Sequence, residues 1–171
     1  TLESAGGEDI FIAKLDPNGN YEWATRAGGN DGDYGYDVSV LADGSSIATG
    51  NFRRTATFGD IELEGDVSFD VFVAKLDTSG NYEWATRAGG GSFVSGRSVS
   101  AFTNGSSIVV AGRFQGTATF GNTTFTSAGS DDVFVAKLDA SGTYEWATQA
   151  GGTSNDSGYG VSVLADGSSI V

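Results

Sequence analysis

The feature that most constrains the fold is a stretch of 21 residues that occurs three times. In its middle copy the stretch runs from Asp70 to Gly90, and the three copies begin at Asp9, Asp70 and Asp132. The period is therefore 61 and then 62 residues, which is too long for one hairpin and suits one small sheet with its loops. We expect the chain to be an array of similar units.

Each copy predicts its own β-hairpin. An apolar run after the aspartate and a Tyr-Glu-Trp-Ala-Thr segment flank a three-residue loop that ends in glycine, at 17–19, 78–80 and 140–142. Such a loop suits a type I turn followed by a left-handed residue. Counting outwards from the first loop predicts three cross-strand pairs: Leu15 with Tyr21, Lys14 with Glu22, and Ala13 with Trp23.

This register places the repeated charges and tryptophans in structural roles. The Lys and Glu side chains should form an exposed ion pair in every copy: Lys14 with Glu22, Lys75 with Glu83, and Lys137 with Glu145. Trp23, Trp84 and Trp146 recur once per unit and are expected to pack between units, because large rings carry much buried area. A set of rings that stack on carbohydrate is the alternative.

The rest of the period predicts two more hairpins. One spans Tyr36–Phe52 and recurs at Arg97–Arg113 and Tyr159–Val171, and a small third one is centred on Gly59-Asp60. A four-stranded antiparallel sheet repeated at a fixed period is typical of a β-propeller blade. The apolar run 71–74 agrees, because a blade is covered on both faces.

The predicted fold class is therefore all-β, a propeller array of four-stranded antiparallel blades. Residues 1–27 are assigned to the outer half of a first blade, 28–88 and 89–150 to complete blades, and 151–171 to an inner half. Thr1 aligns with Thr124 and Val171 with Val109, so both ends fall inside a blade and we expect a piece of a longer repetitive protein. Neighbouring blades, from the parent chain or from another copy in a ring or head-to-tail series, are the expected partners.

The amino-acid composition excludes several classes of function. The formal net charge of −13 argues against nucleic acid and anionic membrane as partners, since both require a basic patch. The chain has no Cys or His, which excludes Ser-His and Cys-His nucleophilic systems and the usual zinc sites within it. The remaining acids recur in every unit, whereas a catalytic site is singular. We expect a protein that is not an enzyme and uses no cofactor.

One joint motif resembles a known family. Gly-Arg-Phe-Gln-Gly-Thr-Ala-Thr-Phe-Gly at 112–121, followed by Ser-Ala-Gly at 127–129 and by Asp-Val-Phe-Val-Ala-Lys-Leu from Asp132, is similar to the bacterial β-propeller repeat called SBBP. The resemblance implies an exported, repetitive, non-catalytic scaffold, extracellular or on the cell surface. Arg53-Arg54 replaces Gln115-Gly116 in the earlier copy, which questions the glycine-type backbone there.

Calcium is a weak candidate ligand of one loop. Asp31, Asp33 and Asp37 gather carboxylate oxygens, the ligands that hard cations require. The loop lacks the spaced ligands and the final bidentate Glu of an EF-hand, and its counterpart at 91–96 has no acid. A solvated acidic loop is the favoured interpretation.

Two functions stay open at this point. The first is a structural or adhesive repeat segment of a bacterial surface protein or extracellular filament. The second is a propeller that binds a glycan or a protein through the variable loops at 28–35, 90–96 and 151–158. The aromatic residues Tyr34, Phe93 and Tyr159 of these segments are the candidate ligand-binding side chains.

Overall fold

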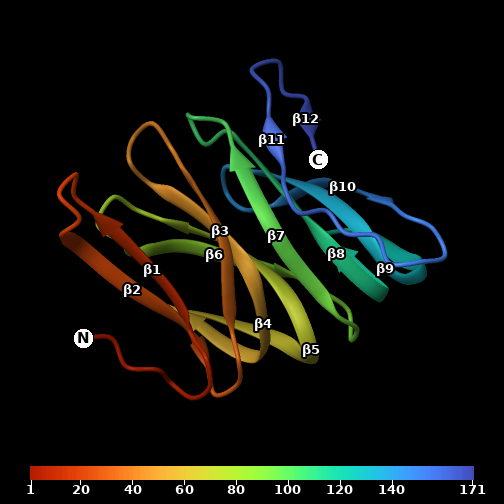
Figure 1. Ribbon diagram of the computed structural model, residues 1–171, viewed down its shortest axis with the longest axis horizontal. Coiled ribbons are helices and arrows are strands. Elements are labelled where there is room, and N and C mark those ends of the chain that lie inside the picture. The colour runs from red at the N-terminus through yellow and green to blue at the C-terminus, as the bar shows by residue number, and fades with distance from the viewer.

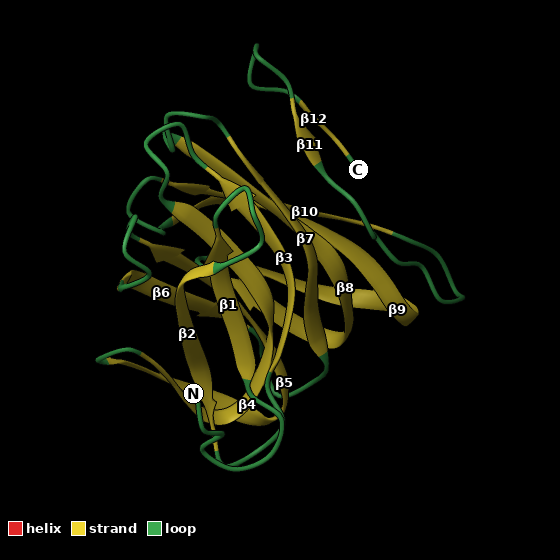
Figure 2. Ribbon diagram, turned by 60° about the vertical axis from the view of Figure 1, so that its left-hand side comes forward, coloured by secondary structure: helices red, strands yellow, loops and turns green.

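The computed structural model describes residues 1–171 and consists of β-strands and loops (Figures 1 and 2). No helix is present that could cross a membrane. The twelve strands are β1 (Ile10–Leu15), β2 (Tyr21–Gly29), β3 (Tyr34–Val40), β4 (Ser46–Phe58), β5 (Ile61–Leu76), β6 (Tyr82–Ala88), β7 (Val94–Ala101), β8 (Ser107–Phe120), β9 (Thr123–Asp139), β10 (Tyr144–Ala150), β11 (Ser162–Val163) and β12 (Ser169–Ile170).

All strand pairs are antiparallel, and the strands fall into repeated units. The sheet order β7-β8-β9-β10 is a simple meander, and β3-β4-β5-β6 repeats it one period earlier. The pair β1–β2 corresponds to the outer half of such a unit, and β11–β12 to the inner half. In Figure 1 the units follow one another from the N-terminal strands at the left to the C-terminal strands at the upper right.

The small third hairpin is not separate. It is the tip of the long hairpin formed by β4 and β5, beyond a register shift between Arg53 and Thr55. This tip also joins neighbouring units, because the end of β2 pairs with β4 at residues 56–58. An isolated bridge between Gly89 and Thr119 makes the same link one unit later.

The predicted register of the outer hairpins is right next to the turn and wrong beyond it. Leu15 pairs with Tyr21, but Lys14 then pairs with Trp23, since Glu22 is the extra residue of a β-bulge. Ala13 therefore does not face Trp23. The ion pairs form nevertheless, because the bulged glutamate stays beside its lysine: Lys14–Glu22 at 2.6 Å, Lys75–Glu83 at 2.8 Å and Lys137–Glu145 at 2.8 Å.

The apolar cores lie between successive units. Phe72 belongs to a core shared with Ile10 and Ala27 of the preceding β1–β2 pair. Its neighbours Val71 and Val73 point the other way, into a core shared with β7–β10. This alternation explains the continuous apolar run, because β5 is covered on both faces as predicted.

The tryptophans also lie between units, but at the margin of these cores. The indole N–H of Trp23 donates to the carbonyl of Thr78, and that of Trp84 to the carbonyl of Ala140, at 3.0 and 3.2 Å. Each acceptor lies in the turn of the next unit. Trp23 and Trp84 are partly buried, whereas Trp146 makes no such hydrogen bond and is 40% exposed. The rings are inter-unit contacts and not fully buried core.

A buried aspartate explains why the repeat begins with Asp and ends with Gly-Gly. Asp70 is 0% exposed, and a Cβ on Gly89 would lie 1.8 Å from its Oδ1 atom. Only glycine leaves room for the carboxylate at that position. Asp70 pairs with Arg87 at 2.5 Å, and burial raises the pKa of its carboxyl group in spite of the arginine.

The inner strands β3 and β7 lie side by side and are linked by side chains. The Oδ2 atom of Asp37 accepts hydrogen bonds from the Ser98 hydroxyl and the Val99 amide, at 2.8 and 2.9 Å. One period later, the Val161 amide donates to the Ser98 hydroxyl at 3.2 Å. The inner strands of successive units are thus linked by the same interaction, in which a side-chain oxygen accepts a hydrogen bond from a backbone amide of the next unit.

Candidate functional site

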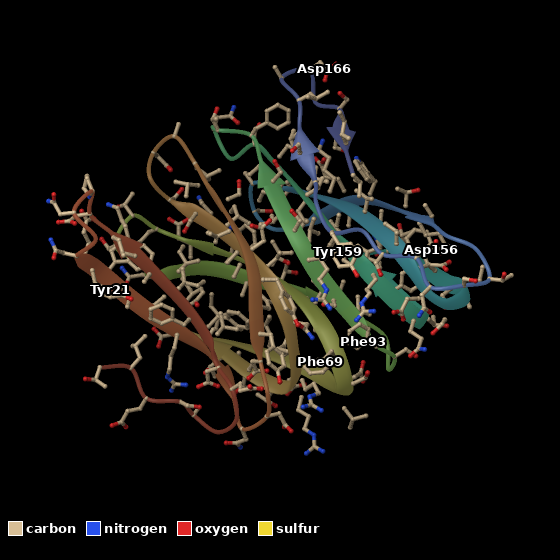
Figure 3. The ribbon with its side chains drawn as sticks, in the orientation of Figure 1. Tyr21, Phe69, Phe93, Asp156, Tyr159 and Asp166 are labelled. Atoms are coloured by element: carbon tan, nitrogen blue, oxygen red, sulfur yellow. The ribbon has the colours of Figure 1, made fainter.

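Four aromatic rings form a continuous row at one edge of the molecule, which we call the rim strip. Its members are Tyr36, Tyr34, Phe69 and Phe93, and successive ring centroids are 6.4, 5.7 and 5.9 Å apart. Figure 3 shows Phe69 and Phe93 close together at the lower edge of the view. The strip spans two units, since Tyr34 and Phe69 belong to one and Phe93 begins the next.

Strand geometry places these rings. Tyr34 and Tyr36 lie at the start of β3, where Tyr34 pairs with Asn51 and Tyr36 is the extra residue of a β-bulge between Gly35 and Asp37. Phe69 lies in β5, directly opposite Arg53 of β4. Phe93 precedes β7, and its carbonyl accepts a hydrogen bond of 2.8 Å from the Gln115 amide. Strand pairing thus positions Tyr34 and Phe69, a bulge positions Tyr36, and a backbone contact positions Phe93.

Each of three arginines lies over a ring of the strip. The guanidinium of Arg97 is 4.3 Å from the ring centroid of Tyr36. Arg53 is 4.4 Å from Phe69, and Arg113 is 5.0 Å from Phe93. The Nε atoms of all three arginines are buried without a hydrogen-bond partner. Cation–π stacking therefore holds the guanidinium groups in place and partly removes them from water.

Two of these arginines have no acidic partner. Seven of the nine basic side chains of the chain form ion pairs, among them Arg113 with Asp131 at 2.6 Å. The two that do not are Arg53 and Arg97. In a chain with 22 acidic residues, both unpaired cations are thus found on the rim strip.

The acids near the strip accept hydrogen bonds from groups other than the guanidinium groups of Arg53 and Arg97, and one of them, Glu8, does so on the strip itself. The hydroxyl of Tyr34 donates a hydrogen bond to Glu8, which raises the pKa of the phenol. Asp33 is 1% exposed, and its carboxylate accepts from the amides of Gly29 and Arg53, at 2.7 and 3.2 Å. Burial raises the pKa of Asp33. Its role is to hold the loop before β3 against β4.

The three calcium candidates do not come together. Asp31 lies 3.7 Å from Arg54, Asp33 binds backbone amides, and Asp37 bonds to β7. No three acidic side chains are grouped so that they could hold a metal ion. The structure thus gives each aspartate a separate local partner.

Of the three aromatic residues predicted to bind a ligand, two lie on the rim strip and one does not. Tyr34 and Phe93 both belong to the rim strip, where Phe69 connects them. Tyr159 is 74% exposed and lies outside the strip.

The sequence interpretation missed Phe69 and the three arginines, although a signal was available. Each departs from its repeat: Phe69 aligns with Asp131, Arg53 with Gln115, Arg113 with Asn51, and Arg97 with Tyr36 and Tyr159. Positions that break the repeat mark the strip.

Comparison with known proteins adds a distant relative. No family model matches the chain. An uncharacterized WD repeat-containing protein of Acanthamoeba polyphaga mimivirus is 28% identical over 116 residues. The similarity covers 64% of this chain and only 8% of that protein's length. It agrees with a repeated, propeller-like all-β domain.

Proposed function

We propose that this chain is a segment of an SBBP-type β-propeller that serves as a non-catalytic structural or adhesive repeat in a bacterial extracellular or cell-surface protein. The observation that carries the proposal is the position of the cores, which lie between successive units. A unit covered by its neighbours on both faces belongs in an array of blades.

The assigned roles of the acidic residues support a non-catalytic protein. The glutamates of the outer hairpins pair with lysines, and the aspartates at the turns accept local hydrogen bonds, as Asp77 does from Asn81. Those hydrogen bonds lower the pKa of Asp77. These groups recur as ion pairs and turn caps, which is unlike the opposed acid and base of a hydrolytic site.

Exposed apolar residues on β1 and β3 support neighbouring blades as partners. Phe11 is 57% exposed, whereas its counterpart Phe72 is 0% exposed. Val38 is 50% exposed, whereas Val99 is 4% exposed. In the proposed array, the inner strands that complete the unit of β1–β2 cover Val38, and the blade before that unit covers Phe11. Both come from the parent chain or from another copy.

The blade arrangement can be tested by extending the chain. Val171 aligns with Val109, so residues 110–150 appended after Val171 would complete the last unit. The added turn should cover Trp146, shift its fluorescence to the blue and raise the melting temperature. The matched control appends the same residues in scrambled order. Equal fluorescence and melting temperature for both chains would contradict the blade model.

The cell-surface assignment needs a separate measurement. Brief protease treatment of intact cells of the source organism should remove the repeat while a cytoplasmic marker survives. Protection of the repeat until the cells are lysed would contradict the assignment.

The rim strip favours a second candidate function. The strip lies at the loops 28–35 and 90–96, so a propeller that binds a glycan or a protein through these loops is compatible with the same fold. The scaffold and the binding function can be tested independently, because the first depends on the inter-unit cores and the second on exposed side chains.

A further inference from the structure

We propose that Arg53 and Arg97, held on the rim strip, bind the carboxylate groups of an acidic oligosaccharide of the uronate type. The inference rests on the glycan-binding form of the proposed function and names its ligand class. The argument starts from the two arginines that have no acidic partner and continues with the rings that hold them.

Both arginines are positioned to receive an anion. A guanidinium stacked on a ring at 4.3 or 4.4 Å keeps a fixed plane, and its outer N–H groups form the fork that matches a carboxylate. Their Nε atoms are buried, so less water competes for the charge. Little side-chain freedom remains to be lost when the anion binds.

The rings between the arginines fit a sugar chain. Arg97 lies at the Tyr36 end of the strip and Arg53 over Phe69, with Tyr34 between. Tyr34 and Tyr36 are nearly parallel, at an interplanar angle of 18°. The row offers apolar ring faces and, at Tyr36, a hydroxyl edge, which complements the alternating apolar and hydroxylated faces of successive sugars. The Tyr34 hydroxyl already donates to Glu8.

Other anionic polymers fit less well. The net charge of −13 repels a dense polyanion such as nucleic acid. An extended peptide gains affinity by adding a strand to a free sheet edge, and an acidic peptide can also bind arginine side chains directly. At Arg53 and Phe69 the two strands already pair with each other, and β4 also pairs with β3, so a peptide would have to bind there through its side chains alone.

The site occurs once although the units repeat. The later unit has Gln115 where Arg53 stands and Asp131 where Phe69 stands, so it presents an acid and an amide instead of a cation and a ring. The repeated positions of the chain explain the fold, and this unrepeated pair is not needed for it. Counterpart residues also supply substitutions that the fold already accommodates.

The test is calorimetric titration of the whole 171-residue chain with tetragalacturonate at low ionic strength. The substitutions are Arg53→Gln, the residue of the later unit, and Arg97→Tyr, the residue of both other copies. Each should weaken binding about tenfold or more, and the double variant should abolish it. Arg54→Gly is the matched control: it removes the neighbouring positive charge, restores the residue of the later unit, and should leave the affinity within about twofold.

Several results would overturn the proposal. They are absence of tetragalacturonate binding, equal weakening by Arg54→Gly, and equal binding of neutral tetragalactose. Tighter binding of a hexaglutamate peptide would assign the site to acidic peptides instead. Melting curves of every variant distinguish a failure of this binding proposal from a failure of the scaffold function. A variant that binds less but melts at the same temperature leaves the blade model intact.

Discussion

The unit β3–β6 and the unit β7–β10 have the same strands and turns, but the equivalent buried aspartate has different partners in each. In the unit β3–β6, Asp70 pairs with Arg87 at 2.5 Å. In the second unit Asp132 is 1% exposed, and Gln149 stands in the arginine's place and donates to the Thr126 carbonyl at 3.4 Å. The amide of Ala128 still binds Asp132 at 3.0 Å. The backbone contact is thus common to both units, while the ion pair is not.

The same two units differ again at the rim strip. Arg53 faces Phe69 across β4 and β5, whereas Gln115 faces Asp131 across β8 and β9. Asp131 then pairs with Arg113, so the later unit neutralises its arginine internally. The comparison teaches that shared positions build the repeated unit, and that differing positions decide which charges remain unpaired.

The largest expected effect concerns the phenylalanines of the outer hairpins. Phe72 and Phe134 are both 0% exposed, and each packs on a second phenylalanine at centroid distances of 4.9 and 4.5 Å. Phe72→Ala and Phe134→Ala should each lower the free energy of unfolding by about 3–5 kcal/mol. Phe11→Ala, at a 57% exposed position, should cost less than about 1 kcal/mol in urea denaturation. Equal losses at all three sites would contradict the packing described.

The next effect tests the aspartate comparison directly. Arg87→Gln leaves the buried Asp70 carboxylate without its cation and should cost about 3 kcal/mol at neutral pH. Gln149→Arg should give Asp132 the missing partner and stabilise the chain by about 1 kcal/mol. Denaturation midpoints of the two exchanges, measured side by side, check both signs. A loss in Gln149→Arg would show that the later unit cannot accept the pair.

Lowering the pH should reduce the loss in unfolding free energy that Arg87→Gln causes. The pKa of Asp70 is raised by burial, so its neutral form is favoured in the folded state. The stability gained by protonating Asp70 in the folded state is fully present when the pH is below 3.8, the ordinary pKa of an aspartate. It is lost as the pH rises through the raised pKa of the folded state. Unfolding of the variant and the parent chain from pH 3 to 7 should therefore show the difference shrinking on the acid side. A constant difference across this range would contradict the assignment to Asp70.

Much of the fold could be predicted from the sequence because the repeat reports strands, turns and period at once. The ion pair of Lys14 with Glu22 was predicted correctly from a register that is itself wrong, since the bulge at Glu22 keeps the two side chains adjacent. A bulge of this kind leaves no clear mark in the residue pattern. The continuity of the third hairpin with β4 and β5 was hidden for a similar reason, because the register shift at Arg53 resembles a strand end.

The rim strip was less predictable because it depends on contacts between units. Arg97 and Tyr36 are 61 residues apart, and their stacking follows from the placement of β7 beside β3. Tyr34 and Phe93 could be selected as aromatic residues of variable loops. Phe69 was missed because it occupies a strand position, and the only mark in the sequence is its departure from Asp131 of the later unit.

A smaller effect separates two tryptophans that the repeat makes equivalent. Trp84 packs against the next turn and donates to the Ala140 carbonyl at 3.2 Å, whereas Trp146 is 40% exposed. Trp84→Ala should cost about 2–3 kcal/mol, below the range for a fully buried ring. Trp146→Ala should cost less than about 1 kcal/mol. Thermal unfolding of both variants decides the matter, and equal losses would mean that the inter-unit contact contributes little.

The smallest expected effect concerns the one residue other than glycine that has a left-handed backbone. Arg54 has φ +56°, close to the φ of +64° at Gly116 in the later unit, so the backbone shape is kept although the residue differs. Arg54→Gly should relieve this strain, but it also increases the conformational freedom of the unfolded chain and removes the exposed pair with Asp31. The net gain should be about 0.5 kcal/mol in the free energy of unfolding, measured by chemical denaturation. The reverse exchange, Gly116→Ala, should destabilise by at least as much, because its Cβ would lie 2.6 Å from the Ser92 hydroxyl oxygen. A loss in Arg54→Gly together with no loss in Gly116→Ala would mean that the two units do not share this turn, since strain at a common backbone shape must act in opposite directions in the two exchanges.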